Sequence, residues 1–452
     1  MLKDNCGLEF TAANQQAIDA FELTVEALYR VATDTGDHLK SVFEADPEMP
    51  MAHCLKGYFF MFMASGPLKQ RAQKAHQDAM KYAKHATPRE LAHIEALGLW
   101  ANDQKASAIK IWDEILEQHP LDAVALRLGH FGHFYSGDAV AMRRVLESVY
   151  PSWNSSTPGY NFILGMKAFA FEECGDYADA EKFGRAGLEL DPVDPWAIHA
   201  VAHIMEMQER RAEGVEWINA HKPNWQGANN FRYHVIWHLA LMHWGLGDFE
   251  RVLSIYDDEL WDPSSDEYAD LCNNAALLVR LEYMGINVGD RWQNLYEKVK
   301  ERTDEHILLF ADVHFAMMYA AMGDDARVHD IISNSPDVGG DLRRDVSGPI
   351  CQAMLDFRKD NCQQAQKTLL DLRGRIIEIG GSHAQRDVFE LLMIEASIKS
   401  GDFETARHML VNRTRTSPDN GLNWKKLAGV LSEMGDGSAA EAETKAGKLL
   451  VA

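Results

Sequence analysis

Apolar and small residues recur along this chain with the spacing of helices, in paired runs that repeat about every 34 to 38 residues. The clearest pair is segment 161–192, NFILGMKAFAFEECGDYADAEKFGRAGLELDP. Its first run carries Ala168, a Gly-Asp turn follows at Gly175, and the second run stops at Pro192. This order predicts a helix, a tight turn, a second antiparallel helix and a break.

The same order of residues returns elsewhere at a fixed distance. Gly401 and Gly435 are 34 residues apart, and so are Ala168 and Ala202. A period of 34, with small residues where two helices cross closely, is typical of tetratricopeptide repeats. We therefore predict an all-α fold of tetratricopeptide-type helix-turn-helix repeats, about 11 pairs, stacked in a right-handed α-α superhelix.

The regularity of the repeats sets the expected domain organisation. Before Pro88 two pairs are poorly defined, so residues 1–87 are expected to form N-terminal degenerate helical repeats. Residues 88–452 are expected to form tetratricopeptide-like repeats in one continuous superhelical domain. No alternating pattern of useful length predicts a β-sheet within it.

The first helix of each pair supplies the inner surface of such a superhelix. In the pair that begins at Pro195, the inward positions hold Trp196, His199, His203 and Glu206. At about 100° per residue, the two histidines and the glutamate fall within about 60° of one another on one helical face. We therefore expect these side chains to line an inner groove.

The next pair repeats this arrangement. It places His234 and His238 one helical turn apart, with Trp237 beside them. Several imidazoles grouped on a groove wall need partners or a ligand, because burying a polar group without a hydrogen bond is costly. The candidate catalytic residues are His199, His203, Glu206, His234 and His238, and Trp196 and Trp237 are candidate binding residues.

Three uses of these five candidate catalytic residues stay open. A lone histidine in a helical repeat is usually a packing residue, which is the structural alternative. The segment HAVAH, residues 199–203, places two imidazoles one turn apart as zinc sites on helices do, although it lacks the glutamate of HExxH. A divalent metal is therefore one candidate cofactor, with the same five residues as its candidate ligands. The third use is metal-free acid/base chemistry by a histidine–glutamate pair.

Further polar residues stand in other first helices and in the loops that lead into them. His130 lies in the RLGHFGHFYSGD segment, and the FADVHF segment carries Asp312 and His314. The loop GGSHAQRD offers Ser382 as an N-cap, which places its last residues at a helix N-terminus that favours anionic groups. The additional candidate binding residues are His130, Asp312, His314, His383, Arg386 and Asp387.

Composition narrows the classes of function. Lys plus Arg total 45 against 68 for Asp plus Glu, a net charge of −23, and no basic cluster stands out. We expect no nucleic-acid partner, because such binding needs a basic surface. No apolar stretch approaches the roughly 20 residues that span a bilayer, so no membrane partner is expected. The six scattered cysteines, and a start without a secretory or transit pattern, favour a cytoplasmic location.

Five segments jointly resemble the tetratricopeptide repeat protein 38 family over essentially the whole chain. They read LDAVALRLGHFGHFYSGD, PGYNFILGMKAFAFEECGDYADAE, DPWAIHAVAHIMEMQ, HVIWHLALMHWGLGDFE and GGSHAQRDVF. The resemblance implies a single all-helical superhelix, but no particular reaction. The family's motif segments correspond here to His130, His199, His203, Glu206, His234, His238, Asp312, His314, His383, Arg386 and Asp387.

Two classes of function follow. The first is a binding scaffold that holds a small molecule, or a protein or peptide partner, in its concave groove. The second is an enzyme of hydrolase or lyase type, with the histidine and glutamate residues as acid/base groups or metal ligands. Clamps for acidic peptide tails use Lys, Arg and Asn, whereas the predicted groove offers His, Trp and Glu, which argues against that ligand. A homo-oligomer is compatible with either class.

Overall fold

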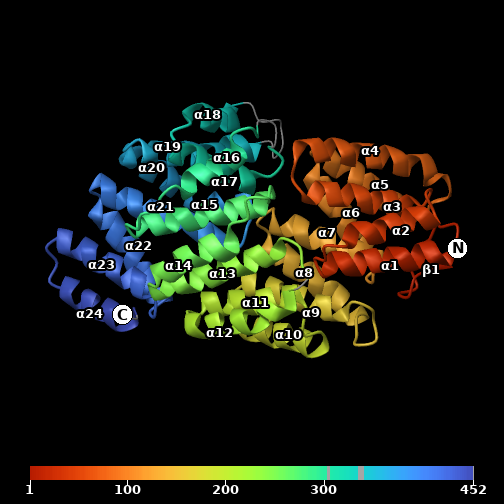
Figure 1. Ribbon diagram of the computed structural model, residues 1–452, viewed down its shortest axis with the longest axis horizontal. Helices are drawn as coiled ribbons and strands as arrows, with labels where there is room; N and C mark the ends of the chain where they lie inside the picture. The colour runs from red at the N-terminus through yellow and green to blue at the C-terminus, as the bar shows by residue number, and fades with distance from the viewer. Residues whose placement is uncertain (226, 303–305, 334–340, 451–452) are drawn as a thin grey trace. The chain divides into compact units, whose positions relative to one another are not determined.

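The computed structural model describes residues 1–225, 227–302, 306–333 and 341–450. Within these ranges the chain forms 24 α-helices, labelled in Figure 1, and one pair of two-residue strands. Short 3₁₀- and π-helical segments carry the label η. The 24 helices correspond to 12 consecutive pairs, one more than the spacing of the repeats predicts. The contacts between residues divide the chain into two compact units, which are taken in turn.

The first unit comprises Met1–Val201 and His221–Arg232, with a short stretch that ends at Leu308. Its elements are β1 (Leu2–Lys3), β2 (Glu9–Phe10), α1 (Gln15–Tyr29), α2 (Thr35–Ala45), α3 (Pro50–Phe62), α4 (Gly66–Tyr82), η1 (Ala83–His85), α5 (Pro88–Ala101), α6 (Lys105–Gln118), α7 (Ala123–Phe134), α8 (Ala139–Val149), η2 (Tyr150–Ser152), α9 (Tyr160–Glu173), α10 (Tyr177–Leu190), the first half of α11 (Pro195–Met207) and η3 (Lys222–Trp225).

The second unit comprises Ala202–Ala220, the chain from Tyr233 to Arg302, and the chain from Leu309 onward. Its elements are the second half of α11, α12 (Arg211–His221), α13 (Phe231–Leu246), α14 (Phe249–Ile255), η4 (Tyr256–Leu260), α15 (Tyr268–Tyr283), α16 (Arg291–Val299), α17 (Leu309–Ala321), α18 (Asp325–Ser333), η5 (Arg343–Ser347), α19 (Gly348–Arg358), α20 (Cys362–Leu372), η6 (Arg373–Ile379), α21 (His383–Ser400), α22 (Phe403–Thr416), α23 (Gly421–Glu433) and α24 (Ala439–Leu449).

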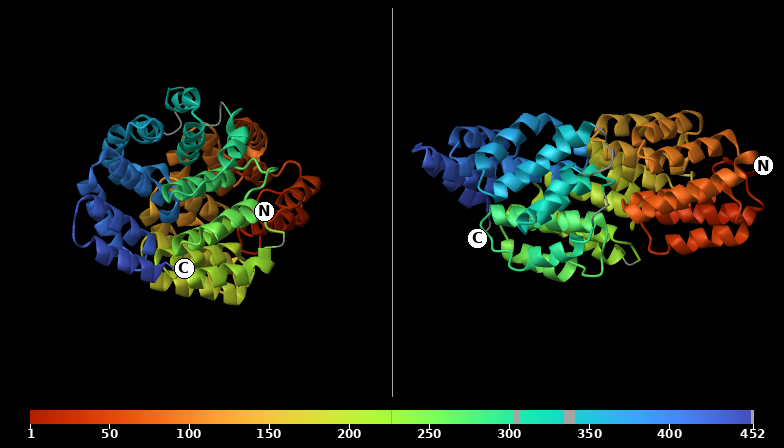
Figure 2. Two further views of the ribbon diagram at one scale, coloured as in Figure 1. Left: turned by 60° about the vertical axis from the view of Figure 1, so that its left-hand side comes forward. Right: turned by 90° about the horizontal axis from the view of Figure 1, so that it is seen from above.

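Within each unit the helices run as antiparallel hairpins, which the two views of Figure 2 show from other sides. In the hairpin α9–α10, Gly175 takes a φ of +78°, a left-handed conformation that glycine adopts without a steric penalty. Helix α10 approaches the next helix, α11, closely because Gly184 has no side chain, and a Cβ there would lie 2.7 Å from Val201 Cγ2 on α11. The predicted fold class, all-α with tetratricopeptide-type helix-turn-helix repeats, is confirmed.

A short β-hairpin at the N-terminus departs from the helical expectation. Strands β1 and β2 pair antiparallel, with Leu2 opposite Phe10. The turn between them is held locally, because the Asp4 carboxylate accepts hydrogen bonds from the backbone N–H groups of Cys6 and Leu8. Gly7 closes the turn with a φ of +82°.

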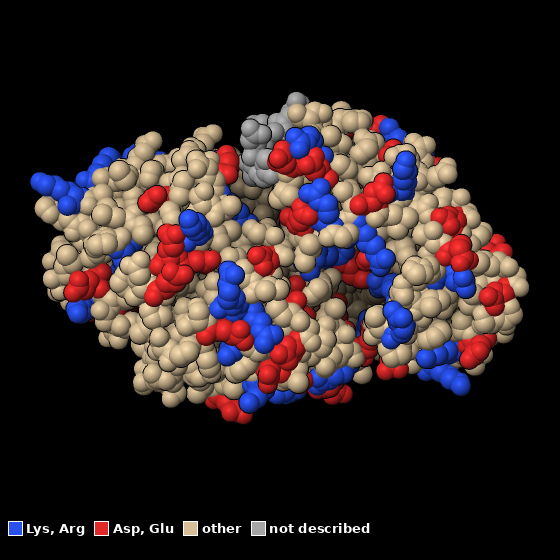
Figure 3. Space-filling model, turned by 180° about the vertical axis from the view of Figure 1, so that it is seen from behind, with Lys and Arg blue, Asp and Glu red and all other residues tan. Residues whose placement is uncertain are grey.

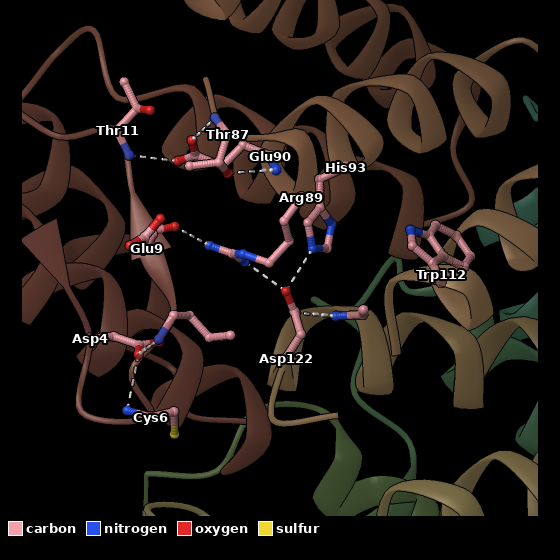
Figure 4. A network of polar contacts seen from close by, with 12 residues as sticks. Asp4, Cys6, Glu9, Thr11, Thr87, Arg89, Glu90, His93, Trp112 and Asp122 are labelled. Atoms are coloured by element: carbon pink, nitrogen blue, oxygen red, sulfur yellow. Dashed lines mark hydrogen bonds and ion pairs between the residues drawn. The ribbon is translucent and has the colours of Figure 1, made fainter. Parts of the chain in front are cut away.

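A buried polar network ties this β-hairpin to the helices of the first unit (Figure 4). The Asp122 carboxylate, 1% exposed, caps α7 and forms ion pairs with Arg89 at 2.6 Å and His93 at 3.1 Å. Arg89 also donates to the backbone carbonyl of Glu9 in β2, and Glu90 accepts from the backbone N–H of Thr11. The start of the chain is therefore anchored by charged groups.

The expected division of the chain at residue 87 can be placed on this fold. Helix α5 begins at Pro88, the first residue of the predicted repeat region, with a capping box formed by Thr87 and Glu90. Helices α4 and α5 on the two sides of that position pack together within the first unit. That residues 88–452 form one continuous domain stays a prediction. No helix among the described residues has the length and apolar character needed to cross a membrane.

Candidate functional site

Three of the predicted histidines come together in the second unit. His234 and His238 lie one turn apart on α13, and His203 lies on the second half of α11. One ring nitrogen of each lies within 4.8 Å of those of the other two. The ring centroids of His203 and His238 are 4.2 Å apart, and those of His234 and His238 are 4.9 Å apart. We call His203, His234 and His238 the histidine cluster.

Two polar side chains orient this cluster. The Nδ1 atom of His238 lies 2.7 Å from a carboxylate oxygen of Glu206, one turn after His203 on α11. The Nδ1 atom of His234 lies 3.4 Å from the amide oxygen of Asn273 on α15. His203 and His238 are fully buried, whereas His234 is partly exposed. The cluster is thus an interior site with one accessible edge.

Burial dominates the electrostatics of this region. It raises the pKa of Glu206 to about 7, although His203 and two arginines act in the opposite direction. Burial also lowers the pKa of His234 to about 3, with a further decrease caused by His203. Both shifts favour the neutral form, because a buried group loses the hydration of its charge.

Glu206 also lines a pocket of about 410 Å³ that belongs entirely to the second unit. We call it the arginine pocket, after the five arginines in its wall. They come from five elements and are Arg211, Arg280, Arg373, Arg386 and Arg413. Besides Glu206, the acidic residues of its wall are Glu209, Asp387 and Glu390.

Arg280 differs from the other pocket arginines in its surroundings. It is 1% exposed and donates to two backbone carbonyls, those of Ala276 at 3.0 Å and Ala384 at 2.7 Å. Among the described residues it forms no ion pair, whereas Arg413 binds the Asp387 carboxylate at 2.5 Å and Arg373 binds Glu390 at 2.7 Å. Burial lowers the pKa of Arg280, against the opposing effect of nearby carboxylates.

The N-terminus of α21 forms another part of the pocket wall. Ser382 caps this helix as predicted, and its hydroxyl accepts from the backbone N–H of Gln385. His383, Arg386 and Asp387 follow in the first turns and all line the pocket. Three of the predicted binding residues therefore converge with Glu206 on one cavity.

Two predicted binding residues of the second unit belong to its core instead. Asp312 on α17 is fully buried and forms an ion pair with Arg343 at 2.8 Å. The Nδ1 atom of His314 lies 2.7 Å from the carbonyl oxygen of Phe310, and burial lowers the pKa of this histidine to about 4. Neither lines the arginine pocket, because α17 places both among packed side chains.

Trp237 stays beside the histidine cluster. This tryptophan of α13 is fully buried and stacks on His234, with the ring centroids 5.6 Å apart. Its indole N–H has no hydrogen-bond partner among the described residues. Trp237 therefore packs the cluster from within α13.

The remaining candidates lie in the first unit. The indole N–H of Trp196 donates to the backbone carbonyl of Tyr29, and Arg127 lies over its ring, 3.9 Å from the centroid. His130 is buried against Phe169, and burial holds its pKa well below the usual value. His199, one turn before His203 on α11, packs against Phe231. Trp196 and His130 have the contacts expected of packing side chains.

Four of the five pocket arginines, Arg211, Arg280, Arg373 and Arg413, are not among the residues predicted from the sequence. Arg211 lies on α12 and Arg413 on α22, second helices of their pairs, which the inward-facing rule does not consider. Asn420 and Asn423, at the start of α23, also line the pocket. The sequence did contain one signal for these arginines: Arg280 is a charged residue within the apolar run AALLVRL of a first helix. The predicted groove positions held His, Trp and Glu, whereas the wall of this pocket also holds arginine and asparagine.

Comparisons with solved structures give distant likenesses. No known family model matches the chain. A human IFIT1 dimer with m7Gppp-AAAA is 12% identical, with a TM-score of 0.39 over 98% of this chain and 97% of that chain. The same dimer with PPP-AAAA is 12% identical, with a TM-score of 0.40 over 98% and 96%. Naa15/Naa10 bound to HypK-THB gives 12% identity and a TM-score of 0.25, over 96% and 63%. These distant likenesses bear on neither the ligand nor the site of this chain.

Proposed function

We propose that this protein binds a small organic anion in the arginine pocket. The observation that carries this proposal is Arg280, a buried guanidinium in the pocket wall whose hydrogen bonds to described residues go to two backbone carbonyls. A guanidinium has five N–H donors arranged to bind carboxylate or phosphate oxygens in pairs. A buried charge that forms no direct ion pair is costly, and Arg280 forms none among the described residues although carboxylates lie nearby, so an anionic ligand paired with it would stabilise this arrangement.

The surroundings of Arg280 support the same class of ligand. The N-terminal turns of α21 line the pocket, and backbone N–H groups at a helix N-terminus favour an anion. Apolar side chains form another part of the wall and suit a ligand with an apolar body next to its acidic head. They are Met207, Leu241, Trp244, Ile376 and Ile377. A volume of about 410 Å³ lies within the range of small-molecule sites.

The test is a ligand screen on the full chain by thermal melts and titration calorimetry. We expect organic carboxylates or phosphate monoesters to raise the melting temperature, and the uncharged amide or alcohol of the same body to leave it unchanged. Whichever acid class binds identifies the head group. Arg280→Met should abolish the ligand-induced shift, and Arg280→Lys should weaken binding at least about ten-fold, because lysine keeps the charge but loses the paired donors.

A matched control variant removes an arginine of the same unit outside the pocket. Arg291→Met breaks the exposed ion pair of Arg291 with Asp257 and should leave ligand binding unchanged. Equal stabilisation by acids and their uncharged analogues would overturn the proposal. Unchanged affinity in folded Arg280→Lys protein would overturn it as well.

Catalysis of the hydrolase or lyase type is the second candidate function. The observation that favours it is the double role of Glu206, which lines the pocket and also hydrogen-bonds His238. A carboxylate–imidazole pair at the wall of a ligand pocket has the groups needed to move protons. Conversion of a bound acid into product during the screen, and its loss with retained binding in Glu206→Gln, would support this candidate.

The family of this protein and the class of its binding partner are likewise proposed. The resemblance to the tetratricopeptide repeat protein 38 family supports a repeat protein whose histidine-bearing segments serve a ligand. Neither the reaction nor the partner follows from that resemblance. A small molecule fits a pocket of this size, and we propose it over a protein or peptide occupant.

A further inference from the structure

We propose that the histidine cluster, His203, His234 and His238, binds one divalent transition-metal ion of the zinc type. The inference goes beyond the binding of an organic anion and does not rest on it. Imidazole nitrogen is a preferred ligand of zinc, copper, nickel and iron, and three histidines with an open fourth position form a known catalytic zinc geometry. The proposal rests on the placement of these three rings.

The distances between the rings fit a common ion after a small adjustment. One nitrogen of each ring lies within 4.8 Å of those of the other two. Three nitrogens bound at about 2.0–2.1 Å around a tetrahedral ion would lie about 3.3 Å apart. Closing the gap thus requires shifts of about 1.5 Å or less, which rotation of the imidazole rings can supply. His234 and His238 already share one face of α13, because they are four residues apart.

The second ring nitrogens of two members carry the contacts that metal-binding histidines characteristically make. His238 Nδ1 faces the Glu206 carboxylate at 2.7 Å, and His234 Nδ1 faces the Asn273 amide oxygen at 3.4 Å. Such contacts fix the tautomer and turn Nε2 toward the metal, and a carboxylate partner also raises the basicity of the ligand. We therefore assign His238 and His234 as Nε2 ligands, and Glu206 as a positioning residue for His238.

The surroundings of the cluster suit a retained ion. His203 and His238 are fully buried, so a bound ion would be shielded from competing water, while the partly exposed His234 offers a route of entry. Glu206 belongs both to the cluster's contacts and to the wall of the arginine pocket. The ion would therefore sit one side chain away from a cavity that can hold a small molecule.

The experiment uses the full chain after treatment with a chelator and dialysis, and Co²⁺ as a spectroscopic probe. We expect one equivalent of Co²⁺ per chain, with the intense visible bands of a tetrahedral nitrogen-ligated ion, and displacement of that spectrum by Zn²⁺. Zn²⁺ should also raise the melting temperature of the wild-type protein, because a ligand that binds the folded state stabilises it.

Variants separate this site from nonspecific binding. His203→Gln, His234→Gln and His238→Gln should each abolish the tetrahedral spectrum. His243→Gln is the matched control, because His243 lies on the same helix α13 but pairs with Asp248 outside the cluster. Glu206→Gln should keep the spectrum and weaken metal affinity about 10–100-fold, as expected for a positioning residue.

Two outcomes would overturn the proposal. One is a wild-type Co²⁺ spectrum identical to that of the aqueous ion, with no effect of Zn²⁺ on the melt. The other is unchanged stoichiometry and spectrum in folded His238→Gln protein. Arg280→Lys should bind Co²⁺ like the wild type, so the failure of anion binding and the failure of metal binding are distinguishable.

Discussion

Two buried aspartates of the first unit cap helices but differ in charge state. Asp122 caps α7 and faces Arg89 and His93, and although burial opposes its ionisation, these two side chains hold its pKa well below the usual value. Asp194 accepts hydrogen bonds from the first backbone N–H groups of α11 and forms no ion pair among the described residues. Burial therefore raises the pKa of Asp194 to about 7.

Asp194 should make stability depend on pH in a definite direction. Its folded pKa of about 7 lies above the ordinary value of 3.8 for aspartate, so its contribution to stability is fully present below about pH 4 and is lost as the pH rises through 7. Asp194→Asn keeps a capping oxygen but cannot ionise. We expect the variant to match the wild type near pH 4 and to be more stable at pH 8, by at most about 4 kcal/mol, since one pKa unit corresponds to about 1.4 kcal/mol.

Urea unfolding of both proteins from pH 4 to pH 8 measures this effect. A difference in unfolding free energy that stays constant over that range would contradict the assignment of Asp194.

Individual site residues were predictable only where their neighbours lie on the same helix. The i, i+4 spacing of His234 and His238 places them together without knowledge of the fold. Trp196 and His130 also lie in predicted first helices, yet they pack against Tyr29 and Phe169 from distant segments. Arg280 was missed because its role depends on the backbone carbonyl of Ala384, 104 positions along the chain. Such contacts are set by which helices meet, which the local pattern does not contain.

The turns within the helix pairs were more predictable, because their geometry is local. The Gly-Asp signal marked Gly401, which indeed ends α21 with a φ of +79°. Three other turns adopt a similar left-handed conformation without glycine, at Asp103, Glu209 and Asp360, with φ between +61° and +65°. Glu209 stands where most of these turns have glycine, yet its backbone takes the same left-handed conformation. The packing of the two helices imposes this conformation on the turn residue.

Asp360 is the clearest place to test that conclusion. It is exposed between α19 and α20, and its φ of +61° costs a residue with a Cβ up to about 1–2 kcal/mol, somewhat less for aspartate. Asp360→Gly should therefore raise the unfolding free energy by about 0.5–1 kcal/mol. Denaturant unfolding measures this, with Gly401→Ala as the reverse control, expected to lose a similar amount. Equal destabilisation by both variants would show that the Asp360 turn carries no strain.

The whole molecule combines a strongly acidic chain with an arginine-lined pocket. The net charge is −23, and acidic and basic side chains are interspersed over the face shown in Figure 3. A net charge this far from zero destabilises the compact state through self-repulsion, whereas exposed ion pairs contribute about 0–1 kcal/mol each. Salt screens both, and we expect relief of the repulsion to dominate.

Salt should therefore act in opposite directions on stability and on ligand binding. Raising NaCl from about 20 to 300 mM shortens the Debye length from about 20 Å to less than 6 Å and should raise the melting temperature by a few degrees. Over the same range the affinity for an organic anion should fall, because chloride competes for the pocket arginines. Melts and calorimetry at matched salt concentrations check both. A melting temperature that falls steadily with salt would contradict the dominance of self-repulsion.

The chain crosses between its two units more than once, which limits how the protein can be divided into fragments. The first unit takes back residues His221–Arg232 after the chain has entered the second, and α11 contributes to both. No single cut in the coding sequence yields either unit whole. A fragment encoded by one end of the gene would therefore lack part of its own core.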